Sequence, residues 1–454
     1  MTSPTIKWAG AILAGGFILS FLGLYNGYPF VYPDTGAYIF SGFQGEVPMD
    51  RPITYGLFIR HSSMAESLFW VMFTQGLLTS LAIYFLLRQF YSSITPFGFI
   101  GLLLALTACT SISYYTSFLT PDLFTPIFWT CLAILLLGNL SGRSFFWVTF
   151  LAWFALIMHS STLVAAVLFT IILAIASLWR RVRAVIPVKK TVMVGLLTLV
   201  GWLSVMSIHL AHNAPFAVQQ AGHAFFLGRL NEIGLLRPHL QKACAEKNYP
   251  ICKYKDEIPD DFLWGQDSPS RKDGGWVAHK TEYRDIIWNI LTTPRDLKNF
   301  AIFAVNGTLM QLAYFRIEDT GAMREQTPPF EAVKQYFPRE LISYKIAHQH
   351  HRNHFLDFSG LNTRQQYLFF GFILLLAGLG HPGVRRRMTP SMAHLLLFCA
   401  IALVINAFVC STFSTVVSRY QGRLLWLAIL VEFVAIIQIG THWYAERKPS
   451  RERA

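Results

Sequence analysis

Residues 31–61 read VYPDTGAYIFSGFQGEVPMDRPITYGLFIRH, a polar stretch between the first two long apolar runs of the chain. It contains several acids and arginines, among them Asp34, Asp50 and Arg51. Its prolines and glycines mark turns, and its aromatic residues suit a membrane surface. Two apolar runs joined by such a segment indicate two membrane spans with a structured loop between them.

The rest of the chain is equally apolar. Of its 454 residues 53% are hydrophobic and 14% are charged, with a mean hydropathy of +0.41, whereas soluble proteins carry about 25% charged residues. The apolar residues form runs of roughly 17 to 22, enough to cross about 30 Å of hydrocarbon at 1.5 Å per residue. The sequence therefore predicts an all-α, polytopic membrane protein with about ten transmembrane helices. The predicted spans are 8–24, 67–87, 97–113, 123–138, 145–158, 162–178, 191–210, 367–379, 392–410 and 424–439.

Charge sets the predicted topology. The fifth and sixth runs are separated only by His159, Ser160 and Ser161, and they form either one tilted helix or a hairpin. In a hairpin, the RRVR cluster at 180–183 lies on the cytoplasmic side, together with most other Lys and Arg residues of the short segments between spans. The positive-inside rule therefore favours the hairpin. The first run lacks a convincing cleavage site and is predicted to be retained. We therefore expect a bacterial inner-membrane protein with both termini cytoplasmic.

The same topology divides the chain into three parts. Residues 1–210 form an N-terminal transmembrane module with catalytic outer loops, 211–366 an extracytoplasmic (periplasmic) domain, and 367–454 the C-terminal transmembrane helices. The inserted domain is expected to be mostly helical. Cys244 and Cys252 lie in it, and outside the cytoplasm a disulfide is favoured over two unlinked thiols.

Two acids stand in predicted outer loops. Asp34 follows the first span in YPDTGAY, and Asp122 precedes the fourth in TPDLF. Either carboxylate could serve as a general base where neighbouring loops shield it. The alternatives are a solvated or N-capping acid for Asp34 and an N-cap for Asp122. Their occurrence on adjacent outer loops is what makes both candidates for a catalytic site.

Several cations and aromatics are candidates for binding an anionic substrate. Arg51 precedes the second span, and its guanidinium suits bidentate phosphate binding, unless it pairs with Asp50 to brace a turn. Arg419 and Arg423 lie four residues apart on one helical face, beside Tyr420. They would hold a phosphate at the lipid surface or anchor the helix at the interface.

Histidines offer two further features. His159, at the outer break between the fifth and sixth spans, could donate to a substrate oxygen or be an ordinary loop histidine. The run HQHHRNH has helical metal-ligand spacing at His350 and His354, but no glutamate supports a metalloprotease motif. We interpret this run as a solvated cluster. No metal site is predicted. A divalent cation is compatible with the sequence but not required by it.

The net charge of +13 does not indicate nucleic-acid binding, because the cations are scattered between helices and form no long basic tract. Walker, dinucleotide-binding and G-x-S-x-G motifs are absent from the sequence.

The segments PDTGAY (33–38), DRPITYG (50–56), TPDLFTPIF (120–128) and SRYQGR (418–423) together resemble the GT-C superfamily of membrane glycosyltransferases. That superfamily includes the protein mannosyltransferases and the aminoarabinose transferases of lipid A. The resemblance covers the membrane part of the chain and not the insertion. Thr35 replaces the second acid of the family's frequent acidic pair, and Ile53 replaces the second proline of its Arg-Pro-Pro-x-Tyr stretch, which places Tyr55 at the tyrosine.

The resemblance implies transfer of a sugar from a polyprenyl-phosphate donor to a lipid, glycan or protein acceptor on the outer face. Asp34 would take the acceptor's proton with Asp122 assisting, and the arginines and Tyr420 would hold the lipid phosphate. Family members of this type usually invert the anomeric centre.

Two other functions are compatible with the sequence. A transporter or flippase of a lipid-linked or anionic substrate would line its path with the same charges, although these lie at the outer edge and no inverted repeat is visible. A non-catalytic subunit for envelope-polysaccharide assembly would use the insertion as an interaction surface. Replacing Asp34 by Asn separates the enzyme from both.

Overall fold

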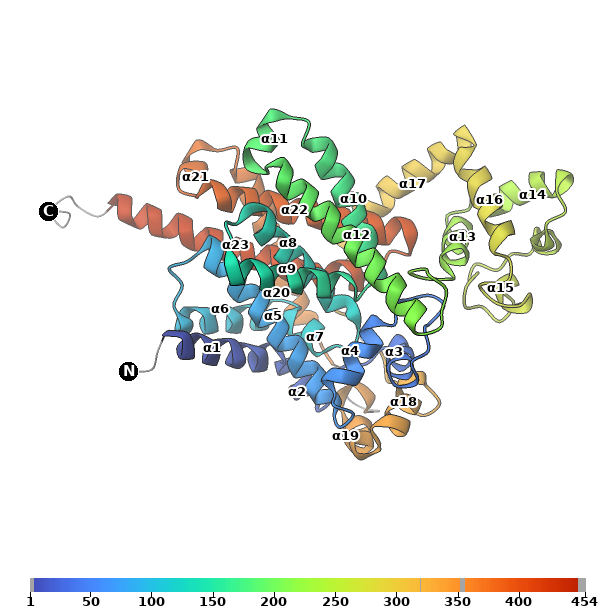
Figure 1. Ribbon diagram of the computed structural model, residues 1–454, viewed down its shortest axis with the longest axis horizontal. Coiled ribbons are helices and arrows are strands. Elements are labelled where there is room, and N and C mark those ends of the chain that lie inside the picture. The colour runs from blue at the N-terminus through green and yellow to red at the C-terminus, as the bar shows by residue number, and fades with distance from the viewer. Residues whose placement is uncertain (1–3, 319, 352–355, 448–454) are drawn as a thin grey trace.

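The computed structural model describes residues 4–318, 320–351 and 356–447, and helices make up most of these ranges (Figure 1). Within them no β-strand is formed, and one isolated bridge pairs Phe30 with Phe118. The predicted all-helical fold class is confirmed.

Each predicted apolar run falls mainly on one helix of a bundle. The bundle helices are α1 (Pro4–Leu19), α5 (Leu68–Phe90), α6 (Pro96–Cys109), α8 (Phe124–Leu137), α9 (Gly142–Leu156), α10 (Ser160–Ala176), α12 (Val188–Ala211), α20 (Ser359–Gly378), α22 (Pro390–Phe413) and α23 (Ser418–Arg447). The runs 8–24 and 97–113 extend past α1 and α6 into the short helices that follow them. By length and composition, α5, α12, α22 and α23 could each cross a membrane, and a bent α9–α10 pair would add a fifth span. These helices indicate a membrane protein. The count of ten spans is not confirmed, because α1, α6 and α8 are apolar but shorter.

The break between α9 and α10 falls where the sequence places it. The two helices are bent by 119° relative to each other. His159 is the N-cap of α10, and its Nδ1 accepts a hydrogen bond from the backbone N–H of Ser161 at 3.1 Å. The polar break therefore places an imidazole at the N-terminus of α10.

Short helices fill the loops between the bundle helices. They are α2 (Phe21–Asn26), α3 (Pro33–Gln44), α4 (Thr54–Ser62), α7 (Ile112–Ser117), η1 (Pro121–Leu123), α11 (Arg180–Val185) and α21 (Pro382–Arg386). The α3 and α4 helices come from the stretch 31–61 and pack against each other. Their backbones meet where a Cβ on Gly42 would collide with the carbonyl of Gly56. This contact folds the stretch into a compact helical hairpin.

The start of α3 is fixed by Thr35. Its hydroxyl accepts a hydrogen bond from the Tyr32 N–H at 2.9 Å and donates one to the Leu119 carbonyl at 3.0 Å. Thr35 therefore ties the first turn of α3 to the segment that precedes Asp122. Asp34 lies in the same first turn, where the helix dipole favours a negative charge.

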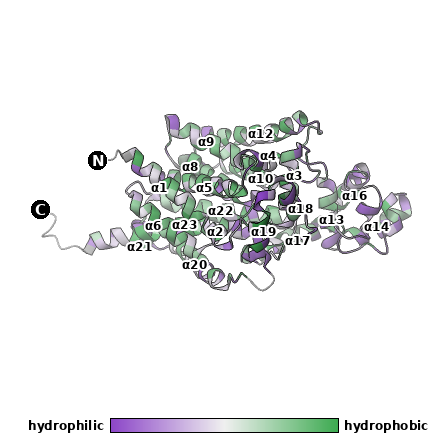
Figure 2. Ribbon diagram, turned by 90° about the horizontal axis from the view of Figure 1, so that it is seen from below, coloured by the Kyte–Doolittle hydropathy of each residue, from purple (hydrophilic) through white to green (hydrophobic). Residues whose placement is uncertain are grey.

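The insertion consists of two parts. The first part is a unit with its own hydrophobic core, and it lies beyond the ends of the long helices, at the right of Figure 1. Its helices are α13 (Gly222–Glu232), α14 (Leu236–Glu246), η2 (Pro250–Tyr254), α15 (Pro269–Lys272) and α16 (Lys280–Thr292). Figure 2 shows more hydrophilic residues in this unit than in the bundle.

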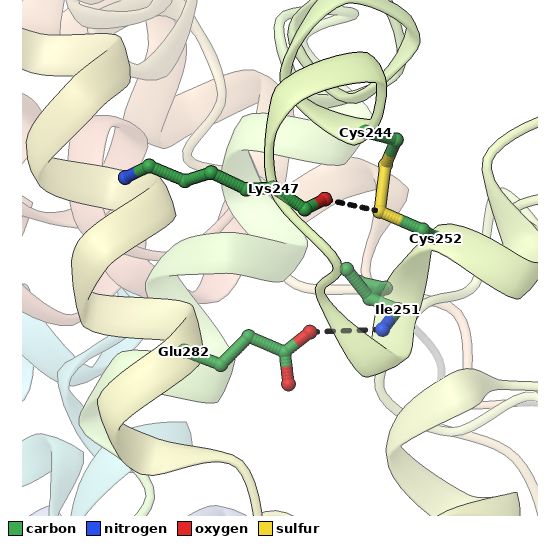
Figure 3. Close-up of a disulfide and its surroundings, with 5 residues drawn as sticks. All are labelled: Cys244, Lys247, Ile251, Cys252 and Glu282. Atoms are coloured by element: carbon green, nitrogen blue, oxygen red, sulfur yellow. Dashed lines mark hydrogen bonds between the residues drawn. A yellow bond between two sulfur atoms is a disulfide. The ribbon is translucent and has the colours of Figure 1, made fainter.

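A disulfide closes the α14–η2 turn of this unit. Cys244 and Cys252 are bonded, and the Cys252 sulfur lies 3.8 Å from the Lys247 carbonyl oxygen (Figure 3). Beside it, the Ile251 N–H donates to the Glu282 carboxylate at 2.8 Å. The disulfide and this hydrogen bond together hold η2 against α16.

We expect the double change Cys244→Ser and Cys252→Ser to loosen this turn. A loop of this length contributes roughly 2 kcal/mol through chain entropy. Protease cleavage between α14 and η2 in the detergent-solubilised protein should therefore become several-fold faster. Cys109→Ser, which removes a free thiol in the bundle, is the control. Equal cleavage rates in all three proteins would contradict a stabilising role for the disulfide.

The second part of the insertion lies against the bundle. It contains α17 (Pro294–Ala313), α18 (Pro328–Tyr336), η3 (Pro338–Glu340), α19 (Leu341–Ile346) and η4 (His348–His350). Helix α17 packs along α22, and α18 packs on α3. The Gln349 side chain hydrogen-bonds the N–H and the carbonyl of Val31, at 3.1 and 2.7 Å. This part of the insertion therefore holds the segment that leads into α3 in place.

The interpretation of the histidine run as a solvated cluster is wrong for His350. This residue is 4% exposed, stacks on Tyr344 with ring centroids 4.2 Å apart, and accepts a hydrogen bond from the Met323 N–H on Nδ1. It is buried because residues 323–350 fold back on themselves. His354, its proposed metal partner, lies outside the described residues.

His350 should make stability depend on pH. Burial, with a smaller contribution from Arg324, lowers its pKa to about 4, against about 6.5 in an unfolded chain. Between these two pKa values the unfolded state binds more protons than the folded state. The contribution of His350 to the free energy of unfolding is therefore complete above about pH 6.5 and is lost as the pH falls toward 4. The melting temperature should fall across this window, and less in His350→Asn. The exposed-site control His442→Asn should behave like the wild type, and an equal fall in all three would contradict this.

Candidate functional site

Asp34 is the meeting point of two arginines from distant parts of the chain. Arg51, in the loop between α3 and α4, places Nη2 3.1 Å from Asp34 Oδ1. Arg419, in the first turn of α23, places Nη1 3.7 Å from Asp34 Oδ2. The carboxylate is 27% exposed, against 14% and 21% for the two arginine side chains. An accessible acid is thus flanked by two mostly buried cations.

Arg51 is held by more than Asp34. Its Nε and Nη2 donate to Asp50, at 2.9 and 2.5 Å, and its guanidinium lies over the Tyr38 ring at 5.0 Å. Burial lowers the pKa of Arg51, but Tyr38 and the two carboxylates outweigh burial and raise it above its usual value. Arg51 therefore stays charged. Its Nη1 is buried and has no hydrogen-bond partner among the described residues.

Arg419 connects Asp34 to the second acid. Its Nε lies 3.6 Å from Asp122 Oδ2, and its guanidinium lies 4.3 Å from the Tyr32 ring centroid and 5.3 Å from that of Tyr420. Two aromatic faces and two carboxylates thus fix the orientation of this side chain.

Asp122 lies behind this surface, 2% exposed. The fully buried Arg423 donates to its Oδ1 at 2.7 Å, and also to Ser161 Oγ and Asn406 Oδ1, both at 3.0 Å. A buried acid is tolerable here because two guanidinium groups compensate its charge. Asp122 and Arg423 form a structural core under Asp34 and Arg419.

Arg423, predicted as a lipid-phosphate contact, is fully buried. Tyr55, also predicted to bind substrate, is fully buried too, and its hydroxyl donates to Gln75 Oε1 at 2.7 Å. Neither side chain lines the cavity described below. Both lie on helices whose inward faces pack in the bundle.

His159 lies at the edge of the Asp122 core. Its Nε2 is 3.9 Å from Asp122 Oδ1. Its Nδ1 accepts a hydrogen bond from the Ser161 N–H, and Arg423 Nη1 lies 3.5 Å from Nε2. His159 also lines the cavity, so the structure brings it to the predicted site.

A cavity of about 190 Å³ opens at this cluster. Its polar wall comes from α3, the α3–α4 loop, the α10 N-terminus and the α23 N-terminus, and it comprises Asp34, Tyr38, Asp50, Arg51, His159, Ser160, Ser161, Arg419 and Tyr420. The end of α22 and the start of the insertion also line the cavity, with Cys410, Phe413, Gln219 and Phe225. The cavity therefore combines cationic, acidic and apolar side chains.

Sequence reasoning missed three contributors to this site. Tyr32 and Tyr38 lie two residues before and four after Asp34, and they place aromatic faces under Arg419 and Arg51. Asn406 was detectable as a lone amide within an apolar span.

In the part of the chain that the structure describes, no three His, Cys, Asp or Glu side chains are arranged to hold a metal ion. The site carboxylates instead pair with guanidinium groups.

Comparison with protein-family models, curated proteins and solved structures finds no match to this chain.

Proposed function

We propose that the chain is a membrane glycosyltransferase that moves a sugar from a polyprenyl-phosphate donor to a lipid, glycan or protein acceptor at the outer face of the membrane. The observation that carries this proposal is the convergence of Arg51 and Arg419 on the accessible Asp34 at a cavity wall. Two guanidinium groups suit a phosphate, and a carboxylate suits the activation of a hydroxyl.

The arginines bind the phosphate of the donor. Arg51 already has a buried nitrogen without a partner, so it can donate a further hydrogen bond. A phosphate oxygen also competes with Asp34 for the donors of Arg51 and Arg419, since both anions seek the same charge-assisted bonds. Donor binding therefore weakens the ion pairs of Asp34 and leaves its carboxylate available as a base.

In the transfer step, Asp34 acts on the acceptor, and Arg51 and Arg419 act on the donor phosphate. Asp34 takes the proton of the acceptor hydroxyl while the acceptor oxygen bonds to the anomeric carbon. The bond from that carbon to the phosphate oxygen breaks, and the electron pair leaves with the polyprenyl phosphate. Arg51 and Arg419 stabilise the charge that develops on this leaving group. Attack opposite the leaving group inverts the anomeric centre.

Asp122 and Arg423 act as positioning residues in this scheme. Asp122 is too buried to receive a proton from an acceptor, and it instead holds Arg419 in place. Arg423 neutralises Asp122 from behind. The proposed base is thus Asp34 alone.

The proposed topology puts the site on the extracytoplasmic side. The cavity is walled by the start of the insertion, and α11 with its arginines lies at the opposite end of the α10 and α12 helices (Figure 1). With the arginines of α11 on the cytoplasmic side of a bacterial inner membrane, the proposal puts the insertion, residues 211–366, in the periplasm. It puts both termini in the cytoplasm. Ten spans are part of this proposal.

A transfer assay tests the function. The purified chain, in lipid vesicles, is given a polyprenyl-phosphate sugar together with extracted envelope acceptors. A transferase releases free polyprenyl phosphate and moves the label to another molecule, whereas a flippase moves the intact donor across the bilayer. Translocation of intact donor without release of polyprenyl phosphate would overturn the proposal in favour of transport.

A further inference from the structure

A second groove, of about 380 Å³, lies on the outer unit of the insertion. It runs between α13 and the exposed face of α16, and its lining comprises Gln219, Gln220, Gly222, His223, Phe226, Lys280, Arg284, Ile287 and Trp288. None of these residues is acidic. The groove thus combines amides, cations and aromatic surface.

Trp288 is the most conspicuous of these side chains because it is 67% exposed. With Lys280 and Arg284 it recurs every four residues along α16, so the three lie on one face of the helix. An exposed indole beside hydrogen-bonding groups offers a flat apolar face against which a sugar ring can lie. The outer unit extends beyond the ends of the long helices (Figure 1).

The charge of the groove is uncompensated. Neither Lys280 nor Arg284 forms an ion pair within the described residues, while the acids of α16 are engaged elsewhere. Glu282 pairs with His279 at 2.9 Å, and Asp285 pairs with Lys247 at 2.8 Å. The groove therefore favours an anionic ligand.

His223 points to the same conclusion. This side chain is 91% buried, being 9% exposed, and lines the groove, yet its Nε2 has no hydrogen-bond partner among the residues described. A buried polar atom without a partner is unfavourable unless a ligand or water satisfies it. The Nε2 atom is covered in this structure, so a ligand hydroxyl or carboxylate in the groove would reach it after a small shift of the neighbouring side chains.

The groove adjoins the proposed active site. Gln219 lines both the groove and the cavity at Asp34. Phe226 of the groove packs on Phe413 of the cavity, with ring centroids 5.7 Å apart. The Gln220 and Ala221 N–H groups both donate to the Met49 carbonyl, close to Arg51. A chain held in the groove can therefore extend toward Asp34.

We propose that this groove binds an acidic saccharide, one that carries carboxylates such as those of uronic acids, as the acceptor of the transfer reaction. The assignment of acceptor rests on the proposed function, whereas binding of the saccharide does not. Trp288 stacks on a sugar ring, Lys280 and Arg284 hold its carboxylates, and Gln220 and His223 bond its polar groups.

Binding to the detergent-solubilised full chain tests the proposal. The probes are tetragalacturonate and its neutral counterpart, the α-1,4-linked galactose tetrasaccharide, measured by titration calorimetry. We expect tetragalacturonate to bind about tenfold more tightly, with an affinity that falls as salt rises. Trp288→Ala should weaken it about tenfold and Arg284→Gln about fivefold, as loss of an anchoring contact does. Lys242→Gln, an exposed cation of the same unit outside the groove, should bind like the wild type.

Failure of tetragalacturonate to bind, or equal binding by Trp288→Ala and Lys242→Gln, would overturn the groove assignment. So would a loss of binding to anionic lipid vesicles in Trp288→Ala with saccharide binding unchanged, since that indicates a membrane anchor. Tetragalacturonate binding is measured without donor lipid, so it does not depend on the transfer reaction. Failure of the groove and failure of the transferase are therefore distinguishable.

Discussion

Asp34→Asn is expected to reduce sugar transfer by about 10² to 10⁴, the range that a positioned general base contributes. Asparagine keeps the size of the side chain and its place in the first turn of α3, but it cannot accept the proton of the acceptor hydroxyl. The loss should therefore appear in the turnover rate. It is measured as release of polyprenyl phosphate under saturating donor.

The matched control is Glu46→Gln. Glu46 is an exposed acid of the same α3–α4 loop, and it forms no ion pair within the described residues. It should keep wild-type turnover. Full activity in Asp34→Asn, with the protein folded, would exclude Asp34 as the base.

Arg423→Met is expected to destabilise the protein by roughly 3 to 5 kcal/mol, because it leaves a buried carboxylate without its main partner. Asp122 would then retain only Arg419, at 3.6 Å, and lose the 2.7 Å bond. Ser161 and Asn406 would lose a donor as well. The expected result is a large fall in melting temperature in detergent.

Two further variants separate this effect from a general loss of packing. Arg385→Met replaces an exposed arginine at the other end of the bundle and should leave stability within about 0.5 kcal/mol of the wild type. The double variant Asp122→Asn with Arg423→Met should recover part of the loss, since the unpaired charge is gone. No recovery would show that packing of Arg423, and not its charge, stabilises the site.

The positions of the helices were predictable because apolar runs follow directly from the need to bury or embed apolar surface. The pairing of Cys244 with Cys252 was equally accessible from sequence, as two cysteines in one polar segment. The number of spans was less accessible. Short apolar helices such as α1 and α6 satisfy an apolar pattern without the length of the longer spans.

Site residues were predictable as a group but not in their roles. Arg419 and Arg423 lie four apart on one helix, and sequence treats them alike. The structure separates them, since Arg419 lies in the first turn at the cavity while Arg423 is one turn deeper in the bundle. The different roles of Arg419 and Arg423 depend on which side chains of α22 and η1 lie next to each arginine. Tertiary packing determines these neighbours, and the sequence does not show them.

The insertion was the least predictable part. Its helices were expected. Its division into an outer unit and a part that packs on the bundle depends on contacts between residues more than three hundred positions apart, such as the hydrogen bonds of Gln349 with Val31. His350 was misinterpreted for the same reason, because a polar run gives no indication that Tyr344 will cover it.

Equilibrium binding of polyprenyl phosphate to the purified protein shows whether Arg51 and Arg419 hold the donor phosphate while Asp34 competes for them. We expect Arg51→Gln and Arg419→Gln each to weaken binding about tenfold or more, because each removes a charge-assisted contact worth about 1.5 to 3 kcal/mol. Asp34→Asn should bind as tightly as the wild type or more tightly. Unchanged binding in both arginine variants, or weakened binding in Asp34→Asn, would contradict the account.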